Sequence, residues 1–341
     1  MAGVTLIGLD IGSTSIRAVE TTRGKDGPAI TNFGYVTLPA GTVQGGVIQD
    51  DATVTTALKQ LWTAARFRGK QIVLGVTNPQ VVVREMAVTN LPGKELRRSL
   101  PFQVRDAMPL PVERSVLDFH PTGPPGDSAQ VRGLLIAAPK DAVLIAVRAV
   151  ERAGLHVARV DLASFALLRA TSRLDGAVEA IIDIGAATTS VIVHADGQPL
   201  IVRTIPRGGA EITDQLASRL SLSPADAEAL KRRTGLSDEN GGEAAEVIRL
   251  AVRPLINEIR SSFAYLTAGD RPTRVTRLAL SGGGAELSGL AEVLGRDLDV
   301  EVVLADPVAR LRDRRAGKTG NVEPLRSSAA VSIGLTLGAA E

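Results

Sequence analysis

The chain has 341 residues, of which 44% are hydrophobic and 22% are charged, a balance typical of a globular protein with more than one domain. Lys and Arg total 39 against 37 Asp and Glu, so the net charge of +2 does not predict a nucleic-acid partner. The absence of cysteine excludes disulfides, thiolate metal sites and a cysteine nucleophile, and three scattered histidines argue against a histidine-rich metal site.

The sequence shows no targeting or membrane-spanning segment. The N-terminus lacks a charged region and its apolar run is short, which does not fit a signal peptide. Residues 331–340 are apolar, but they are far fewer than the roughly 20 residues that a membrane span needs. We therefore expect a cytoplasmic protein.

The first predicted elements form a unit that recurs in the second half of the chain. Residues 8–20 read GLDIGSTSIRAVE, and residues 181–193 read IIDIGAATTSVIV. Each copy has an apolar strand ending in Asp-Ile-Gly, then small and hydroxyl residues, then a second apolar run that reaches a turn. A third strand follows, at 30–38 in the first copy and at 200–205 in the second. The repeat indicates two related half-molecules.

Helices and strands alternate along the rest of the chain, which indicates α/β sheets covered by helices. Apolar residues at helical spacing predict helices at 53–67, 141–153, 210–220, 224–233 and 243–268. Short apolar runs predict strands at 71–76, 133–137, 157–161, 275–280 and 300–304. Residues 121–130 and the basic stretch 306–324 are expected to be loops.

The first Asp-Ile-Gly turn carries a candidate phosphate site. Gly12 lets the backbone turn tightly and approach a ligand. Successive N–H groups in such a turn suit phosphate oxygens, and the hydroxyls of Ser13, Thr14 and Ser15 add donors. Asp10, at the end of the strand, is placed to hold Mg²⁺ directly or through water. Taken alone, the motif also fits an ordinary hairpin turn.

The second turn favours a shared site. Two such turns facing each other across a cleft would clamp a polyphosphate from both sides, with Asp10 and Asp183 as the metal-binding carboxylates. The other predicted contacts of this copy are Gly185, Ala186, Thr188 and Thr189.

A third glycine-rich element follows the strand predicted at 275–280 and precedes a helix-like run at 287–294. Gly282, Gly283 and Gly284 lie where backbone can approach a nucleotide closely, although a triple glycine alone also fits a flexible turn. No G-x-x-x-x-G-K-[ST] motif occurs, which excludes a P-loop. No Rossmann G-x-G-x-x-G stands in a suitable strand–helix setting.

In this order the three elements resemble the motifs of the actin, heat-shock chaperone and sugar-kinase superfamily. The two turns match phosphate 1 and phosphate 2, the glycine run matches the adenosine motif, and residues 160–170 and 328–338 match connect 1 and connect 2. The resemblance implies an α/β, actin-like (ribonuclease H-like) fold with two duplicated lobes that hold ATP and Mg²⁺ between them. In connect 2, the small residues Ala330, Gly334 and Gly338 recur every four residues, which predicts close packing of two helices.

The resemblance also assigns nucleotide contacts outside these motifs. It implies that Glu228 and Lys231 contact ribose and adenine, although their i, i+3 spacing equally fits a surface ion pair. Gly208 and Gly209 complete the predicted site. Ala186 and Ala187 depart from the family pattern, in which more polar residues are common, so we expect fewer side-chain donors at the second turn.

The segment between the two turns narrows the resemblance. Its matching features lie in residues 84–118 and 133–170, and they include Leu91-Pro92, Met108-Pro109, Glu113, Asp118 and Ala137-Ala138-Pro139-Lys140. These features resemble the PilM family of type IV pilus assembly proteins, which is similar to the cell-division protein FtsA. In this group an inserted subdomain, 1C, replaces subdomain 1B of actin.

The resemblance implies an order of subdomains along the chain. We expect 1A at 1–79, the inserted 1C at 80–155, 1A again at 156–180, 2A at 181–206, 2B at 207–270, 2A again at 271–320, and a return helix to 1A at 321–341.

The PilM resemblance further implies a scaffold of the pilus inner-membrane platform. Its expected partner is the N-terminal cytoplasmic peptide of the membrane protein PilN, bound in a groove between 1A and 1C. Other platform proteins or the assembly ATPase, and self-association, are further expectations. The protein would then be peripheral to the inner membrane through its partners, and at most a weak ATPase.

Two alternatives on the same fold stay open. A small-molecule kinase or strong ATPase would need a catalytic base, for which Glu20, Asp161 or Gln215 could be proposed, although none has a motif behind it. An FtsA-like filament protein would carry an amphipathic membrane helix at its end, and residues 334–341 lack the basic face of such a helix.

Overall fold

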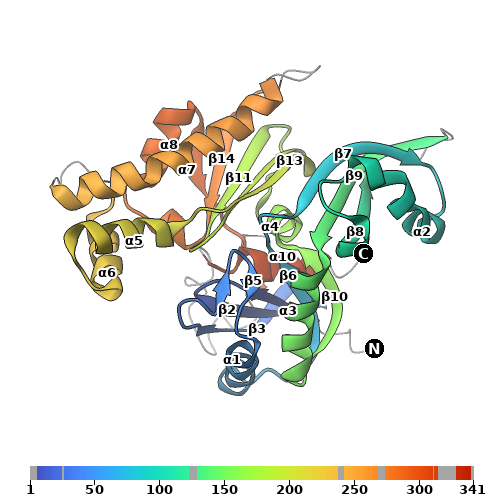
Figure 1. Cartoon of the computed structure of the whole chain (residues 1–341), viewed down its shortest axis with the longest axis horizontal. Coiled ribbons are helices and arrows are strands. Elements are labelled where there is room, and N and C mark those ends of the chain that lie inside the picture. The colour runs from blue at the N-terminus through green and yellow to red at the C-terminus, as the bar shows by residue number, and fades with distance from the viewer. Residues whose placement is uncertain are drawn as a thin grey trace.

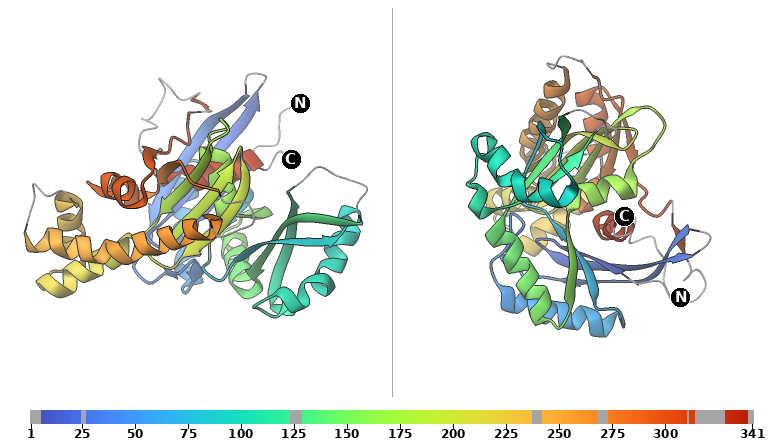
Figure 2. Two further views of the ribbon diagram at one scale, coloured as in Figure 1. Left: turned by 90° about the horizontal axis from the view of Figure 1, so that it is seen from above. Right: turned by 90° about the vertical axis from the view of Figure 1, so that its right-hand side faces the viewer.

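The computed structural model describes residues 6–24, 27–122, 129–236, 242–267, 273–309, 311–313 and 328–338. Two large sheets form two lobes, and a smaller sheet projects from one side of them (Figures 1 and 2). The first large sheet, in the order β10-β6-β1-β2-β3-β16, contains β1 (Leu6–Ile11), β2 (Ser15–Gly24), β3 (Gly27–Thr37), β6 (Gln71–Val76), β10 (His156–Leu162) and β16 (Arg312–Asp313). The second, in the order β13-β12-β11-β14-β15, contains β11 (Val178–Ile184), β12 (Thr189–Ala195), β13 (Gln198–Ile205), β14 (Arg277–Ser281) and β15 (Glu301–Leu304).

The smaller elements complete the architecture. The small sheet, in the order β7-β9-β8, contains β7 (Val82–Thr89), β8 (Ser115–Pro121) and β9 (Gln130–Pro139), and β4 (Val43–Gln44) pairs with β5 (Val47–Ile48). The α-helices are α1 (Asp51–Ala64), α2 (Gly93–Val104), α3 (Lys140–Arg152), α4 (Ala163–Thr171), α5 (Gly209–Leu220), α6 (Pro224–Thr234), α7 (Glu243–Thr267), α8 (Leu290–Leu298) and α10 (Ala330–Gly338). Short 3-10 turns cover Arg105–Ala107, Val112–Arg114 and Gly283–Glu286.

Most of the predicted elements are present. The five predicted helices correspond to α1, α3, α5, α6 and α7, and the strand predicted at 71–76 is β6. The helix-like run at 287–294 begins later than expected, at Leu290, because Gly289 adopts a left-handed backbone (φ 80°) after the 3-10 turn. Most of the two predicted loops, 121–130 and 306–324, lies outside the described residues.

The internal repeat is a structural duplication. Strands β1, β2 and β3 form an antiparallel meander, and β11, β12 and β13 form a second one. At the same register position, Asp10 pairs with Arg17 in the first meander and Asp183 pairs with Ser190 in the second. The two copies therefore differ in the residue opposite the aspartate, which is charged in the first and neutral in the second.

Helices cover the outer face of each large sheet. Helices α1 and α3 pack on the first sheet, where Leu58 and Val150 share a core with Ile7 and Leu9. Helices α5, α7 and α8 cover the second sheet (Figure 1). The expected insert extends to residue 155, but the packing of α3 places this helix with the first lobe.

Helices α4 and α10 lie between the two large sheets. Helix α10 packs on β1 and β2, and α4 packs on α10 and on the second sheet. A Cβ on Gly334 of α10 would stand 1.7 Å from the carbonyl oxygen of Ala166 in α4. The predicted stripe of small residues is thus confirmed as the seam between two helices in backbone contact.

The small subdomain is made of β7, β8, β9 and α2, and its sequence predicted only the core of β9. Helix α2 begins at a glycine and contains Pro101, both of which weaken helix propensity. Its helical form is stabilised by packing, because Leu100 and Val104 bury against Val88 and Leu135 of the sheet. Tertiary contacts therefore outweigh the local sequence here.

Candidate functional site

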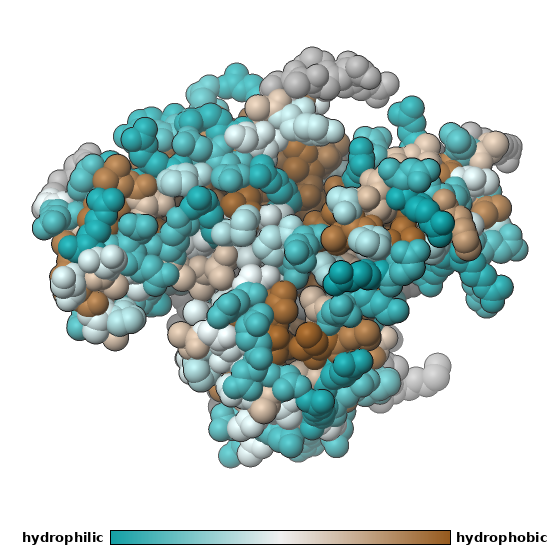
Figure 3. All heavy atoms as spheres, in the orientation of Figure 1, coloured by the Kyte–Doolittle hydropathy of each residue, from teal (hydrophilic) through white to brown (hydrophobic). Residues whose placement is uncertain are grey.

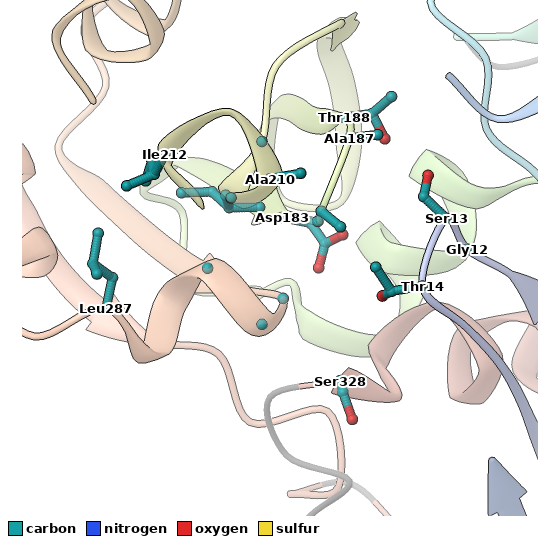
Figure 4. Close-up of a pocket in the computed structure, with 18 of the residues that line it drawn as sticks. Gly12, Ser13, Thr14, Asp183, Ala187, Thr188, Ala210, Ile212, Leu287 and Ser328 are labelled. Carbon is teal, nitrogen blue, oxygen red and sulfur yellow. The ribbon is translucent and has the colours of Figure 1, made fainter. Parts of the chain in front are cut away.

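The two Asp-Ile-Gly turns face one cavity of about 510 Å³ between the lobes. Figure 4 shows Ser13 and Thr14 of the first turn on one side, with the Asp183 side chain directed into the space between the turns. The predicted site residues that line the cavity are Asp10, Gly12, Ser13, Thr14, Asp183, Gly185, Ala186, Thr188, Gly208, Gly209, Glu228, Lys231, Gly282, Gly283 and Gly284.

Two predicted residues, Ser15 and Thr189, do not line the cavity. Each is the first residue of the strand after its turn, and each is buried. The Thr189 hydroxyl donates to the Arg207 carbonyl at 2.8 Å. Because side chains alternate along a strand, their neighbours at the turns reach the cavity and these two do not.

The two turns share one backbone geometry. The Gly12 N–H donates to the Ser15 carbonyl at 3.0 Å, and the Gly185 N–H donates to the Thr188 carbonyl at 2.9 Å. These bonds tighten each turn so that its tip, with Ser13 in one copy and Ala186 in the other, lines the cavity. Both copies thus present backbone and small side chains to a ligand.

The three glycines after β14 differ in what surrounds them. A Cβ on Gly282 or Gly284 would collide with Ile184 of the second turn, at 2.4 and 2.3 Å. A Cβ on Gly283 would meet nothing within 4 Å. Gly282 and Gly284 therefore allow the chain to pack against the second Asp-Ile-Gly turn. At Gly283 the absence of a side chain keeps this wall of the cavity open.

Asp10 is held beside a cation. The Arg17 guanidinium lies 3.7 Å from the Asp10 carboxylate, and both residues line the cavity. Burial raises the pKa of Asp10, and the charge of Arg17 opposes this rise. Arg17 is not among the site residues predicted from the sequence, although its place opposite Asp10 in the repeat was a readable signal.

Asp183 lacks such a partner because Ser190 occupies the position of Arg17. Burial raises the pKa of Asp183 to about 6, and the nearby charge of Asp10 adds to the rise. The Ser281 hydroxyl on the neighbouring strand β14 and the charge of Arg17 oppose it. Two half-buried carboxylates, of which Asp10 disfavours the ionisation of Asp183, form a site that a divalent cation would stabilise.

Glu228 and Lys231 form an ion pair that also binds groups at the start of α5, and we call this contact the α5–α6 latch. The Lys231 ammonium donates to the Gly209 carbonyl at 3.0 Å and to the Thr213 hydroxyl at 2.9 Å, and it lies 2.6 Å from Glu228. Burial alone would raise the pKa of Glu228, but hydrogen bonds from Lys231, Thr213 and Arg232 outweigh it and lower the pKa to about 2. The latch ties α6 to the N-terminus of α5 at the cavity wall.

The opposite end of the cavity is apolar. In Figure 4, Ile212 and Leu287 lie on the far side of Asp183 from Ser13. The apolar wall consists of Ile212, Val252, Leu255, Leu287 and Leu290. These residues come from α5, α7 and the segment around α8, and no local motif marked them. A flat ring system such as a nucleotide base could pack against this end, and the phosphates of the same ligand would then lie towards the aspartates.

The three bases considered for a kinase lie outside the lining of this cavity. The Glu20 carboxylate accepts a hydrogen bond from the Thr31 hydroxyl at 2.7 Å, and Asp161 forms an ion pair with Arg169. Gln215 lies on the exposed side of α5. The structure therefore does not support the kinase alternative through these residues.

A family model described as "Type IV pilus assembly protein PilM" matches residues 8–340. The chain belongs to this family. A solved structure described as the PilM–PilN type IV pilus biogenesis complex superposes with a TM-score of 0.87 at 28% sequence identity, covering 98% of both chains. Family membership and fold are thus supported over almost the whole sequence.

More distant relatives confirm the actin-like fold. The cell-division protein FtsA of Bacillus subtilis (strain 168) is 24% identical over 348 residues, which cover 88% of this chain and 78% of that protein. MreB5 of Spiroplasma citri, solved with bound ADP, superposes with a TM-score of 0.55 at 14% identity, covering 98% of this chain and 95% of MreB5. In the ranges that the structure describes, no helix has the length and apolar character needed to cross a membrane.

Proposed function

We propose that this chain binds Mg-ATP in the cavity and PilN at a separate groove, as a nucleotide-dependent scaffold of the pilus platform. The observation that carries the nucleotide site is the convergence of both duplicated turns on one cavity with an apolar wall. Asp10 and Asp183 would hold Mg²⁺, which neutralises phosphate charge, and magnesium needs few protein ligands because it keeps waters and phosphate oxygens. Backbone N–H groups and the Ser13, Thr14 and Thr188 hydroxyls would hold the phosphates.

Nucleotide-free protein should gain stability when Mg-ATP is added. At about 100 times the dissociation constant the gain is about 2.7 kcal/mol, measured as a shift of the thermal unfolding midpoint. Asp10→Asn and Asp183→Asn should each reduce this shift, because each removes a carboxylate from the metal site.

Glu301→Ala, which removes an exposed acid on β15, is the matched control and should keep the full shift. No shift in the wild type would contradict the nucleotide site. Equal shifts in all variants would contradict the roles of the two aspartates.

The affinity for Mg-ATP should fall below pH 6. The Asp183 carboxylate, with a pKa of about 6, must lose its proton to bind a cation, so protons and Mg²⁺ compete for it. The free energy of unfolding of the nucleotide-free protein should show the opposite dependence and be larger at low pH. The folded state binds this proton more tightly than the unfolded state, so stability from this group falls as the pH rises through 6.

Titrations between pH 5 and 8 by calorimetry would measure the affinity. The Asp183→Asn variant should retain only the pH dependence of the nucleotide itself. A wild-type profile identical to that of this variant would rule out Asp183 as the titrating group.

The partner proposal rests on family membership and on the solved PilM–PilN complex. We assign the small subdomain to 1C and the first lobe to 1A, with the remaining boundaries as expected from the sequence. Within the described residues, β8 and β10 are edge strands of their sheets, and Val116 and Val160 on them are exposed. An extended peptide can add main-chain hydrogen bonds at such edges and place side chains in adjacent pockets.

A ring contact links the small subdomain to the lobes. The rings of His120 on β8 and Phe165 on α4 lie 6.1 Å apart, which joins 1C to the lobes. Figure 3 shows apolar residues gathered around α3, where Leu144 and Val147 are half-buried. Such a surface favours a peptide with apolar side chains. Binding to PilN would hold the chain at the cytoplasmic side of the inner membrane.

A labelled PilN N-terminal peptide should bind the purified chain in a fluorescence-polarisation titration. Val160→Glu should weaken binding at least about tenfold, because it places a charge against an apolar contact. Leu250→Glu on α7 is the matched control, since Leu250 is 39% exposed and Val160 is 38% exposed. Absence of binding with and without Mg-ATP would contradict the scaffold proposal, and equal effects of both variants would contradict the location of the groove.

A further inference from the structure

The outer side of α2 carries cations around one exposed aromatic ring. Leu100 and Val104 pack on the small sheet, so helical spacing turns Lys94, Arg98 and Phe102 away from it. Phe102 is 76% exposed. We call this surface the basic ridge and define it as Lys94, Arg97, Arg98, Phe102 and Arg105.

Most of the cations of the basic ridge are not held in ion pairs. Among the described residues, Lys94, Arg97 and Arg98 form no ion pair. Arg105 lies 3.7 Å from Glu113, and both side chains are mostly exposed, so this pair is weak. Glu95 and Asp106 are exposed on or beside the same face, so the ridge presents a small net positive charge carried by its four cations.

The ridge also points away from the rest of the molecule. Helix α2 covers one face of the small sheet, and His120, on the other face, contacts Phe165 of α4. Figure 2 shows this subdomain projecting from the lobes with α2 at its outer side. The ridge is thus free to meet a second surface while the groove on the other side is occupied.

We propose that the basic ridge contacts anionic lipid headgroups when the chain is held at the membrane. The proposal rests on the proposed function, because a PilN peptide bound beside 1C continues into a membrane protein and keeps this subdomain near the bilayer. Lys and Arg side chains near an anionic leaflet are attracted to it, and an aromatic ring fits the interfacial layer.

The composition of the ridge favours a lipid surface over the core of a protein interface. Interface cores contain Arg and aromatic residues but are poor in Lys and Glu and join several apolar side chains, whereas this ridge sets a single ring among Lys94, three arginines and the exposed Glu95. Each cation near an anionic leaflet strengthens binding about fivefold, too little for stable binding by the ridge alone. Tethering through a partner raises the effective concentration, so a weak contact becomes significant.

Vesicles that display the PilN peptide on a lipid anchor would test the contact. The full chain should bind vesicles containing phosphatidylglycerol at least about tenfold more tightly than vesicles of phosphatidylcholine alone, and added salt should reduce the difference. The double variant Lys94→Glu, Arg98→Glu should lose the preference, and Phe102→Ala should weaken it.

The matched control is Lys59→Glu with Arg253→Glu, which changes the net charge equally at exposed sites on α1 and α7. It should keep the preference. Polarisation with the soluble peptide, run on every variant, separates loss of the PilN groove from loss of the lipid contact, and thermal melts confirm folding. Equal binding to both vesicle types, as expected if the ridge serves an acidic protein instead, would overturn the proposal, as would equal losses in the control.

Discussion

Replacing Glu179 with alanine should lower the free energy of unfolding by about 3–5 kcal/mol, because it removes the buried carboxylate that Arg277 and His194 share. The Glu179 side chain is fully buried and lies 2.7 Å from Arg277 and 3.0 Å from His194. The N–H of Arg173 also donates to it, at 2.9 Å. Urea unfolding followed by circular dichroism would measure the loss.

The hydrogen bonds of the same network assign the tautomer of His194. The Gly197 N–H donates to Nδ1 of His194 at 3.2 Å, so Nε2 carries the proton and donates to Glu179. Burial alone would raise the pKa of Glu179, but hydrogen bonds from His194, Arg173 and Arg277 outweigh it and leave the pKa below its usual value. The stability from this group is therefore present above the usual glutamate pKa and is lost as the pH falls below it.

Glu258→Ala is the matched control for this prediction. Glu258 pairs with Arg203 at 2.5 Å, but both side chains are substantially exposed, so its removal should cost no more than about 1 kcal/mol. If Glu179→Ala and Glu258→Ala destabilise the protein equally, the buried network is not the source of stability that we infer.

Gly334→Ala should destabilise the protein by about 2–3 kcal/mol, although alanine is the better helix former. The added Cβ would stand 1.7 Å from the Ala166 carbonyl oxygen, so α4 and α10 would have to separate. The two helices join both large sheets, and Val331 of α10 lines the cavity. We therefore expect weaker Mg-ATP binding as well, measured by calorimetry on the folded variant.

Gly93→Ala provides the comparison for Gly334→Ala. Gly93 also lies in a helix, but a Cβ there meets nothing within 4 Å, so the substitution should change stability by less than about 0.5 kcal/mol. A Gly334→Ala variant as stable as wild type would show that the seam can open without cost, against the packing argument.

The two duplicated turns differ more in the charges around their aspartates than in their backbone geometry. The same hydrogen bond closes both turns, yet Asp10 faces Arg17 and Asp183 faces Ser190. One carboxylate is consequently paired with a cation before any ligand binds, whereas the other is protonated below about pH 6. This asymmetry makes Asp183 the residue whose titration should report on the proposed metal binding.

The sequence by itself determined the two turns, the α/β class and the family. The turns depend on local chemistry, because a glycine after a strand lets the backbone turn tightly, and the α/β class follows from the alternation of strand and helix patterns. The small-residue stripe ending at Gly338 was also readable, since close helix packing requires it.

Only the tertiary structure decided which side chains meet in the site. Strand alternation turns Ser15 and Thr189 away from the cavity, and cross-strand register places Arg17 beside Asp10. The apolar wall gathers residues from helices far apart in the sequence, and α2 forms against its own propensity because the small sheet buries Leu100. Such positions are set by long-range packing, which no single segment encodes.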